Sequence, residues 1–521
     1  MPEHLRALVV ILAIAALVFG LAHKPLVACG MATEDFKRRR NLWFGVTLAA
    51  FLAHDFWFYS LIVAVMLAAY GLRDRNPIAL YVVLVFTVPP FGVEIPGFGL
   101  INYVFELDHI RLLNLTLLLG ALLRPSGEPT TPAAHAGTGA AGKLLLGYLG
   151  LLIGLTMLLG NFTGTMRTAF TLGVDIGLPF YVGYRTLRSR AALKDAAAAF
   201  VLAGAVLAAI AVFEFGKGWL LYASLETALN VPWSMGNYLA RGEGGALRAL
   251  ASTGHPIVLG YVLVVSLAFA IMVAPRIAPP WLRVPLFLLL VSGLVVSLSR
   301  GPWIGAGLMV VVALGIGQGA ASRLFKLCLA VVAIGGILIV SPWGDQVIGY
   351  LPFVGTVDAG SIDYRSRLFE VSLGVLANSP FFGAWDYMLN PAMEEMRQGE
   401  GIIDMVNTYL AVAMSTGMVG LSLFVGVFLA ATWACFKAWR AASADPEMER
   451  LGRCLLAALA GAALTIATVS SIGAVPTVYW LLAGMMLAYS QVPVLAPARS
   501  QVGPLQRFGR GPSRSARPRG A

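Results

Sequence analysis

Arginines at the ends of apolar runs are the residues of this sequence best suited to chemistry. Arg300 stands in SLSRGPWIGAGL between two apolar runs, each long enough to enter a lipid bilayer. A single arginine in such a place is explained by a guanidinium that reaches up to lipid phosphate. Arg111, Arg167 and Arg248 also end apolar runs and are expected on the same face as Arg300. Several together favour an anionic ligand, because the planar guanidinium binds phosphate oxygens in pairs.

The apolar runs that carry these arginines make up most of the chain. Of its 521 residues, 58% are hydrophobic and 12% are charged, and the mean hydropathy is +0.80. Long apolar blocks separated by short basic or Gly/Pro-rich joints are typical of a polytopic helical membrane protein. We therefore expect an all-α fold of about 13–15 transmembrane helices. The block 42–70 fits either a hairpin of two short helices or one long tilted span.

Charge asymmetry predicts the orientation of these spans. The residues after Pro497 include six arginines and no acid, and the positive-inside rule places such a tail in the cytoplasm. Nucleic acid is not its expected partner, because the tail has almost no interleaved aromatic residues. Alternation of the spans then leaves two long loops, 216–255 and 341–405, on the outer face. The second loop contains nine acidic and three basic residues, which agrees with an outer position.

These expectations divide the chain into six parts. They are N-terminal transmembrane helices (1–124), a flexible cytoplasmic linker (125–142), transmembrane helices that include Arg300 (143–340), a large outer loop (341–405), C-terminal transmembrane helices (406–492) and a disordered basic tail (493–521). The four cysteines lie in or beside apolar blocks and form no close-spaced pair. Neither a disulfide nor a metal site is therefore expected.

The large outer loop is expected to form a lid of short helices on the membrane surface. Residues 367–378 fit an amphipathic helix, whose apolar side would contain Leu368, Phe369, Val375 and Leu376. A second short helix is expected with Asn390 as its cap and Pro391 in its first position. Loops held on a rigid scaffold often carry function, so we expect the chemistry here.

Three motifs in this order resemble a known family. SLSRGPWIGAGL is followed by YRSRLFEVSLGVLANSPFFG and then by DMVNTYLAVAMSTGMVGLSLFV, and together they resemble the shared core of the O-antigen ligase and O-antigen polymerase (Wzy-like) superfamily of bacterial inner-membrane proteins. The resemblance covers residues 249–427 by motif. It implies a metal-independent glycosyltransferase without a cofactor, acting at the periplasmic face. Its donor would be an undecaprenyl-diphosphate-linked glycan, whose lipid diphosphate leaves as a hydroxyl attacks the anomeric carbon.

The resemblance also implies which residues hold the donor. By position, the two arginines that bind the diphosphate in the family correspond to Arg300 and Arg365, and Arg248 would extend the clamp. Arg365 is preferred to Arg367 because its spacing to the later loop residues follows the family pattern better, and Arg367 stays a candidate for substrate binding. Paired guanidiniums would stabilise the charge that develops on the leaving diphosphate.

One departure from the family pattern concerns the acceptor. Ligases of the family carry a histidine directly before the asparagine that opens the span after the loop, whereas this sequence has Val406 before Asn407. The general base is therefore open, with Asp404 as the candidate and Glu400 and His255 behind it. A solvated loop carboxylate explains Asp404 equally well. His255 and Asn407 are also candidates for substrate binding. The missing histidine favours a polymerase over a ligase.

Four carboxylates outside the large loop need an explanation as well. Asp175 lies well inside an apolar span, and such a carboxylate suggests a function. A pair with Arg167, or a cap for a helix broken at Gly177 and Pro179, are structural alternatives. Outer-face acids near Arg111, which are Glu94, Glu106 and Asp108, are expected to form a structural ion pair.

These observations lead to one expected function and two alternatives. We expect polymerisation of undecaprenyl-diphosphate-linked oligosaccharide repeat units into a surface polysaccharide, either an exopolysaccharide or an O-antigen. Transfer of the glycan to a lipid A core or another acceptor is the first alternative, and transport of a lipid-linked glycan or anionic solute is the second. A transporter would place charges along a path through the bilayer, whereas here they gather on one face. Membrane lipids are expected partners, and a flippase and a chain-length regulator of the same pathway are left open.

Overall fold

The computed structural model describes most of the chain. The residues described are 1–97, 99, 102–124, 138–231, 245–317, 319–342, 344, 349–350, 360–397, 401 and 403–492. The predicted linker falls largely on 125–137, and the predicted tail on 493–521, so both lie outside the described residues, as does Glu400. The last four residues of the predicted linker belong instead to a helix that begins at Gly139.

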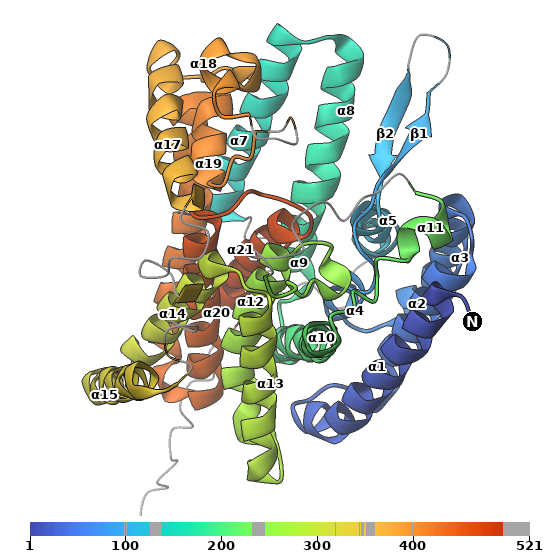
Figure 1. Ribbon diagram of the computed structural model, residues 1–521, viewed down its shortest axis with the longest axis vertical. Coiled ribbons are helices and arrows are strands. Elements are labelled where there is room, and N and C mark those ends of the chain that lie inside the picture. The colour runs from blue at the N-terminus through green and yellow to red at the C-terminus, as the bar shows by residue number, and fades with distance from the viewer. Residues whose placement is uncertain are drawn as a thin grey trace, which may run out of the picture.

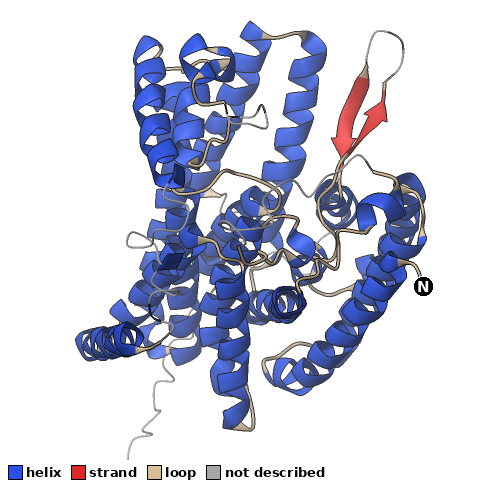
Figure 2. Ribbon diagram, viewed as in Figure 1, coloured by secondary structure: helices blue, strands red, loops and turns tan. Residues whose placement is uncertain are grey.

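The architecture is helical, with one short hairpin of strands (Figure 2). The helices are α1 (Glu3–Ala28), α2 (Thr33–Leu52), α3 (Phe56–Ala69), α4 (Pro77–Leu84), α5 (His109–Leu113), α6 (Leu119–Leu123), α7 (Gly139–Leu159), α8 (Phe162–Leu172), α9 (Leu178–Thr186), α10 (Arg190–Lys217), α11 (Leu225–Leu229), α12 (Pro256–Val273), α13 (Arg283–Val296), α14 (Arg300–Gly315), α15 (Ala320–Val340), α17 (Gly360–Asn378), α18 (Pro391–Glu394), α19 (Thr408–Ala441), α20 (Pro446–Ile466) and α21 (Val475–Gln491). Strands β1 (Val93–Pro96) and β2 (Tyr103–Leu107) pair antiparallel. This hairpin was not anticipated from the sequence.

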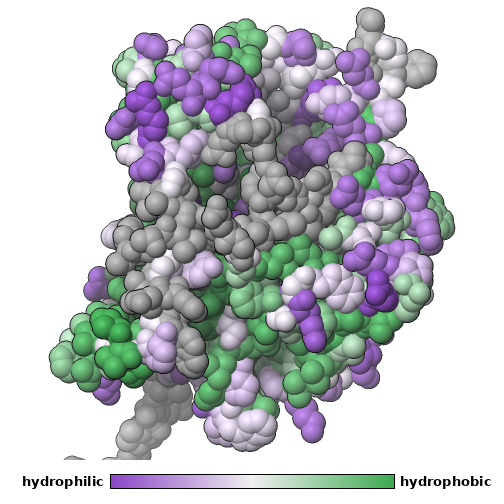
Figure 3. Space-filling view, viewed as in Figure 1, coloured by the Kyte–Doolittle hydropathy of each residue, from purple (hydrophilic) through white to green (hydrophobic). Residues whose placement is uncertain are grey.

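The long apolar helices confirm an all-α polytopic membrane protein. Seven helical segments in the described part of the chain are long and apolar enough to cross a membrane, and three shorter apolar helices accompany them. Hydrophobic side chains gather over α15 and the central and lower parts of the molecule, whereas hydrophilic ones cover α17 and α18 at the top (Figure 3). The larger number of spans expected from the sequence stays a prediction.

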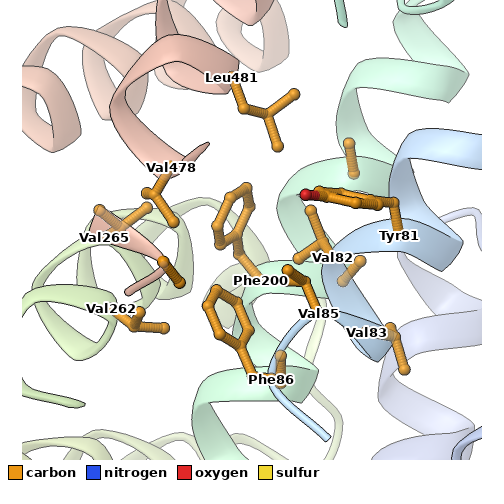
Figure 4. Packing of buried hydrophobic residues seen from close by; sticks show 14 of the residues in the cluster. Tyr81, Val82, Val83, Val85, Phe86, Phe200, Val262, Val265, Val478 and Leu481 are labelled. Atoms are coloured by element: carbon orange, nitrogen blue, oxygen red, sulfur yellow. The ribbon is translucent and has the colours of Figure 1, made fainter. Parts of the chain in front are cut away.

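The core of the bundle lies where α4, α10, α12 and α21 meet. In α10 and in α12, 83% of the residues in the most apolar 18-residue stretch are buried. Phe200 of α10 lies between side chains of α12 and α21 on one side and of α4 on the other (Figure 4). By contrast, α15 stands apart from the bundle (Figure 1) and none of its residues is buried. Its apolar side chains are therefore left to face lipid.

Small residues bring α14 and α20 into close contact. A Cβ atom added at Gly305 would lie 2.7 Å from the carbonyl oxygen of Gly461, and one added at Gly461 would lie 2.9 Å from the carbonyl oxygen of Gly305. Such close backbone approach is typical of helices packed in membranes. Because α14 begins at Arg300, this contact fixes the guanidinium relative to the end of α20.

The block 42–70 forms two helices, which settles the alternative left open by the sequence. The chain turns between α2 and α3 at His54, whose φ is +58°. The Asp55 carboxylate accepts hydrogen bonds from the backbone N–H groups of Trp57 and Phe58, so Asp55 is the N-cap of α3. An aspartate at this position stabilises a helix start.

The lid, defined here as residues 360–397, contains both helices that the sequence predicts. Its first helix, α17, is longer than expected and begins at Gly360. Asn390 caps α18 through a bond from the N–H of Ala392, and Pro391 takes the first position, as predicted. Of the residues expected on the apolar side, Leu368 is buried against the protein, whereas Phe369 is 51% exposed. The reason is that α17 packs on α18 and α19 through Leu368 and not on a flat surface.

A sharp break divides α19. Gly417 has φ +66° and ψ −170° between two helical segments, a conformation open almost only to glycine. The rings of Tyr409 and Phe424 have their centroids 6.0 Å apart, although a straight helix would separate these two residues by about 22 Å. The chain therefore changes direction at Gly417, and the apolar stretch 408–441 is not one continuous helix.

The turn after α17 completes the hydrogen bonds that this break leaves open. The N–H groups of Met418 and Val419 donate to the carbonyl oxygens of Pro380 and Phe381, at 2.8 and 3.1 Å. In return, the N–H of Ala384 donates to the carbonyl oxygen of Met414 at 2.8 Å. Backbone groups released in apolar surroundings need such partners. The lid is thereby joined to the middle of α19.

Replacement of Gly417 by alanine is expected to destabilise the protein by about 2–4 kcal/mol. Two effects add, because the conformation excludes a Cβ atom and that atom would lie 2.2 Å from the backbone of Phe381. Thermal unfolding of the purified protein in detergent would measure the loss. Gly426→Ala in the same helix is the control, since its Cβ atom would meet only the flexible Leu144 side chain at 3.3 Å. Equal melting temperatures for the two variants would contradict this account.

Candidate functional site

Arg300 lies at the start of α14 and is buried. Its side chain is 9% exposed, and its Nη2 donates to the carbonyl oxygen of Gly349, at 3.3 Å. Gly349 belongs to the segment 341–405, which also contains the lid. The guanidinium therefore connects the start of α14 to this segment.

Arg248 approaches the same place from another loop. Its Nη2 donates to Ser299 Oγ at 3.0 Å, and Ser299 directly precedes Arg300. The backbone supports this contact, since the N–H of Ala249 donates to the carbonyl oxygen of Val296 at the end of α13, at 3.1 Å. The structure thus places the Arg248 guanidinium against the residue that directly precedes Arg300. Guanidinium groups are suited to binding phosphate oxygens.

His255 lies close to this pair and is neutral. It is the N-cap of α12, and its Nδ1 accepts a hydrogen bond from the N–H of Ile257 at 3.2 Å. Burial, with a further contribution from the positive charge of Arg248, lowers the pKa of His255 to about 4. A ring with this pKa is a weak base. The structure therefore favours a capping role for His255 over a catalytic one.

The connection between α20 and α21, residues 467–474, links the arginines to the candidate base. A Cβ atom at Gly301 would lie 2.4 Å from Thr468 Oγ1, so this connection packs directly beside Arg300. Two residues later, Ser470 Oγ donates to Asp404 Oδ1 at 2.7 Å. The start of α19 is held in the same way, since Thr408 Oγ1 donates to the carbonyl oxygen of Val469 at 2.9 Å.

Neither Ser470 nor Thr468 was singled out from the sequence. A signal was present, because TVSSIG is a short polar run between two apolar blocks. Hydroxyl side chains at such a point satisfy backbone and carboxylate groups that would otherwise be buried without partners. Their contacts with Asp404 and Gly301, however, depend on the folded chain.

Asp404 is half-buried and firmly held. Besides the bond from Ser470, its backbone N–H donates to the Tyr364 hydroxyl, and that hydroxyl donates to its carbonyl oxygen, both at 3.1 Å. Asn407 is the N-cap of α19 and accepts a hydrogen bond from the N–H of Leu410 at 3.1 Å. Its side-chain oxygen therefore serves the helix. The Asp404 carboxylate is placed on the segment that joins the lid to the bundle.

The two lid arginines occupy different positions. Arg365 is exposed on α17 directly after Tyr364, which puts it on the part of the lid that contacts Asp404. Arg367 forms an ion pair with Glu395 at 2.9 Å and a longer one with Glu370 at 3.6 Å. Its charge is thus balanced by two glutamates on the lid surface.

The remaining outer arginines bind other parts of the chain. Asp175 was expected to pair with Arg167 or to cap a helix, but it pairs with Arg111, whose Nε and Nη2 both lie 3.0 Å from Asp175 Oδ2. Arg111 also approaches Glu106 at 3.7 Å, so the structural ion pair expected there is present. Arg167 instead donates to two carbonyl oxygens of β2 and stacks on the Tyr103 ring, with 3.5 Å to its centroid. Asp175 therefore has a structural partner.

No site for a metal ion is found in the described part of the chain. None of its His, Cys, Asp and Glu residues form a group of three or more that could hold one. The cysteines there are free thiols.

Comparison with known proteins gives a match over the centre of the chain. Residues 285–425 match the family model Wzy_C, described as O-antigen ligase. A comparison with curated proteins found no match. The matched segment runs from α13 into α19 and includes Arg300, Arg365 and Asp404, whereas Arg248, His255 and Ser470 lie outside it. The chain is therefore a multipass helical membrane protein whose residues 285–425 are similar to the Wzy_C family, described as O-antigen ligase.

Proposed function

We propose that the protein polymerises undecaprenyl-diphosphate-linked oligosaccharide repeat units into a surface polysaccharide at the periplasmic face of the bacterial inner membrane. The family match supports glycan transfer at a coarser level. The observation that carries the finer proposal is the contact of Arg248 with Ser299, directly before Arg300, beside the connection that also holds Asp404. An anion-binding pair next to a carboxylate fits a donor with a diphosphate leaving group.

Each residue then has a definite role in the reaction. Arg300 and Arg248 hold the diphosphate of the donor, with Arg365 approaching from the lid. The acceptor hydroxyl oxygen bonds to the anomeric carbon, the bond from that carbon to the diphosphate oxygen breaks, and the electron pair leaves with the lipid diphosphate. Asp404 takes the hydroxyl proton, and Ser470 orients the carboxylate through its hydrogen bond. Fixed guanidiniums stabilise the developing negative charge in a site of low dielectric.

Transfer to a lipid A core or another acceptor is the second candidate function. The description of the matching family as a ligase favours it. Val406 argues against it, because it stands where ligases of the family carry a histidine. Asp404 is then the proposed proton acceptor. The same donor site would serve both reactions, so the acceptor decides between them. As partners of such an enzyme we propose a flippase and a chain-length regulator of the same pathway.

Arg300→Ala is expected to reduce activity by about 10²–10³-fold or more, because one guanidinium that stabilises the leaving group is lost. Arg300→Lys is expected to recover little, since an ammonium group cannot make the paired contact. Reconstitution in proteoliposomes with a lipid-diphosphate-linked oligosaccharide, with products separated by size, would measure both.

The control for this experiment is Arg283→Ala, at the other end of α13, where the side chain donates to the carbonyl oxygens of Pro275 and Ile277. A ladder of products from the donor alone supports a polymerase. Products only after addition of a lipid A core would replace it with a ligase, and inertness to both would favour transport. Full activity of Arg300→Ala would remove this residue from the site.

Asp404→Asn is expected to lower kcat by about 10²–10⁴-fold while donor binding is retained, because the amide cannot take the proton. Ser470→Ala should have a smaller effect in the same direction. Single-turnover rates and binding of undecaprenyl diphosphate would separate the two steps. Asp386→Asn, on the lid surface, is the control. If Asp404→Asn turned over at the rate of the unchanged protein, another base would have to be found.

The pH–rate profile is expected to be the same for the unchanged protein and for His255→Asn between pH 6 and 8. With a pKa of about 4, which burial lowers from the ordinary value, only about 1% of His255 is protonated at pH 6. Asparagine preserves the helix cap. An acid limb near pH 6.5 that disappears in the variant would show that His255 titrates during turnover.

A further inference from the structure

A buried carboxylate lies at the end of α10, away from the candidate diphosphate contacts. Glu214 is 0% exposed. Its Oε1 accepts a hydrogen bond from the N–H of Leu221 at 3.0 Å, and its Oε2 accepts from the N–H groups of Leu250 and Ala251 at 3.1 and 2.8 Å. Burial of a carboxylate is unfavourable unless it is hydrogen-bonded. Three backbone donors provide that compensation here, and two belong to one loop.

The loop is shaped around this carboxylate. Leu250 has φ −119° and ψ −30°, and the next residue, Ala251, has φ +49°. Successive right-handed and left-handed residues turn their N–H groups inward and form a concavity for an anion. Ala251 has a Cβ atom, so its positive φ is unfavourable without compensation. The Glu214 carboxylate fills the concavity and thereby stabilises the turn.

The same loop carries Arg248. Only Ala249 separates Arg248 from Leu250, and its N–H is bonded to the end of α13. On the other side, the Ser252 hydroxyl donates to the carbonyl oxygen of Phe86. The position of the Arg248 guanidinium against Ser299 therefore depends on a turn that Glu214 holds in place.

We propose that Glu214 is a positioning residue for the donor site, which fixes the loop so that Arg248 meets the diphosphate beside Arg300. This inference rests on the proposed function. Glu214 touches no substrate, since its carboxylate is enclosed and bonded to the backbone. It affects the donor only through Arg248. The effect of replacing Glu214 on donor binding should therefore depend on Arg248, whereas a general loss of stability would not.

The test is a double-mutant cycle with Glu214→Gln and Arg248→Ala in proteoliposomes. Glutamine keeps the shape but turns an N–H group toward at least one backbone N–H, so the turn loses a partner. Glu214→Gln is expected to raise the apparent KM for the donor about tenfold, with a smaller change in kcat. In the Arg248→Ala background it should have no further effect on KM, because residues that act through one contact are non-additive. An equal effect in both backgrounds would overturn the inference.

A direct binding measurement separates this inference from the proposed function. Undecaprenyl diphosphate should stabilise the unchanged protein against heat, and Glu214→Gln less at the same ligand concentration. Glu226→Gln, a half-buried glutamate of α11, is the matched control and should behave as the unchanged protein. If Arg300→Ala lowers ligand binding and Glu214→Gln does not, the inference fails and the proposed function stands. If Arg300→Ala leaves both binding and activity unchanged, the proposed function fails.

Two further variants keep the test informative if Glu214→Gln folds poorly. Ser299→Ala removes the contact of Arg248 without touching Glu214 and should raise the KM for the donor in the same way. Ala251→Gly, combined with Glu214→Gln, should restore folding, because glycine adopts a positive φ without cost. An unchanged KM in a well-folded Ser299→Ala protein would show that Arg248 is not placed through this chain of contacts.

Discussion

The need to satisfy every backbone N–H and C=O group in apolar surroundings determines the form of this site. Wherever the chain leaves a regular helix near the outer end of the bundle, another segment supplies the missing partner. The turn after α17 does so for the break at Gly417, Glu214 for Leu250 and Ala251, and Thr408 for Val469. These hydrogen bonds from other segments hold the candidate residues in place. Irregular backbone at this depth is thus both a cost to folding and the origin of the site.

Buried charged side chains away from the candidate site also have hydrogen-bonding partners from other segments. Arg39 is completely buried between α2 and α10 and donates to both Asp74 and Asp195, with bonds of 2.7–2.9 Å. Arg111 and Asp175 form a less buried pair between α5 and the π-helical segment Gly173–Gly177 before α9. Breaking a buried pair on one side leaves an uncompensated charge, which is strongly destabilising. These arginines are therefore part of the scaffold, in contrast to Arg300, which contacts the outer loop.

The parts of the fold that the sequence predicts are those set by local physics. Long apolar runs predict the membrane helices, and Asn390 with Pro391 predicts the start of α18, because caps depend on a few neighbouring residues. The partner of Asp175 was wrong because the sequence favoured a neighbour, Arg167, over Arg111, which lies 64 residues away. Contacts of this kind arise only when distant segments pack together.

The candidate site was predicted in the same uneven way. Arg300 and Arg248 were selected because arginine is conspicuous at the end of an apolar run, and in the structure Arg248 contacts the residue before Arg300. Asp404 was found by its place before Asn407. Glu214 and Ser470 were missed, because each acts through a bond to a segment 36 or 66 residues away. In the sequence, nothing distinguishes Glu214 from other glutamates near helix ends, because only the structure shows its backbone partners.

The division between lid and bundle suggests how donor and acceptor recognition are separated. Arg248 and Arg300 belong to the bundle, whereas Asp404 follows a lid that packs on α19 through its own apolar cluster, which includes Leu368, Met393 and Met414. The break at Gly417 joins that cluster to the membrane part of α19 by backbone bonds. Under the proposed function, changes in the lid that leave Arg365 in place would alter the acceptor surface while Arg248 and Arg300 keep their positions. This arrangement would allow polymerases and ligases of one superfamily to share a donor site and differ in what they extend.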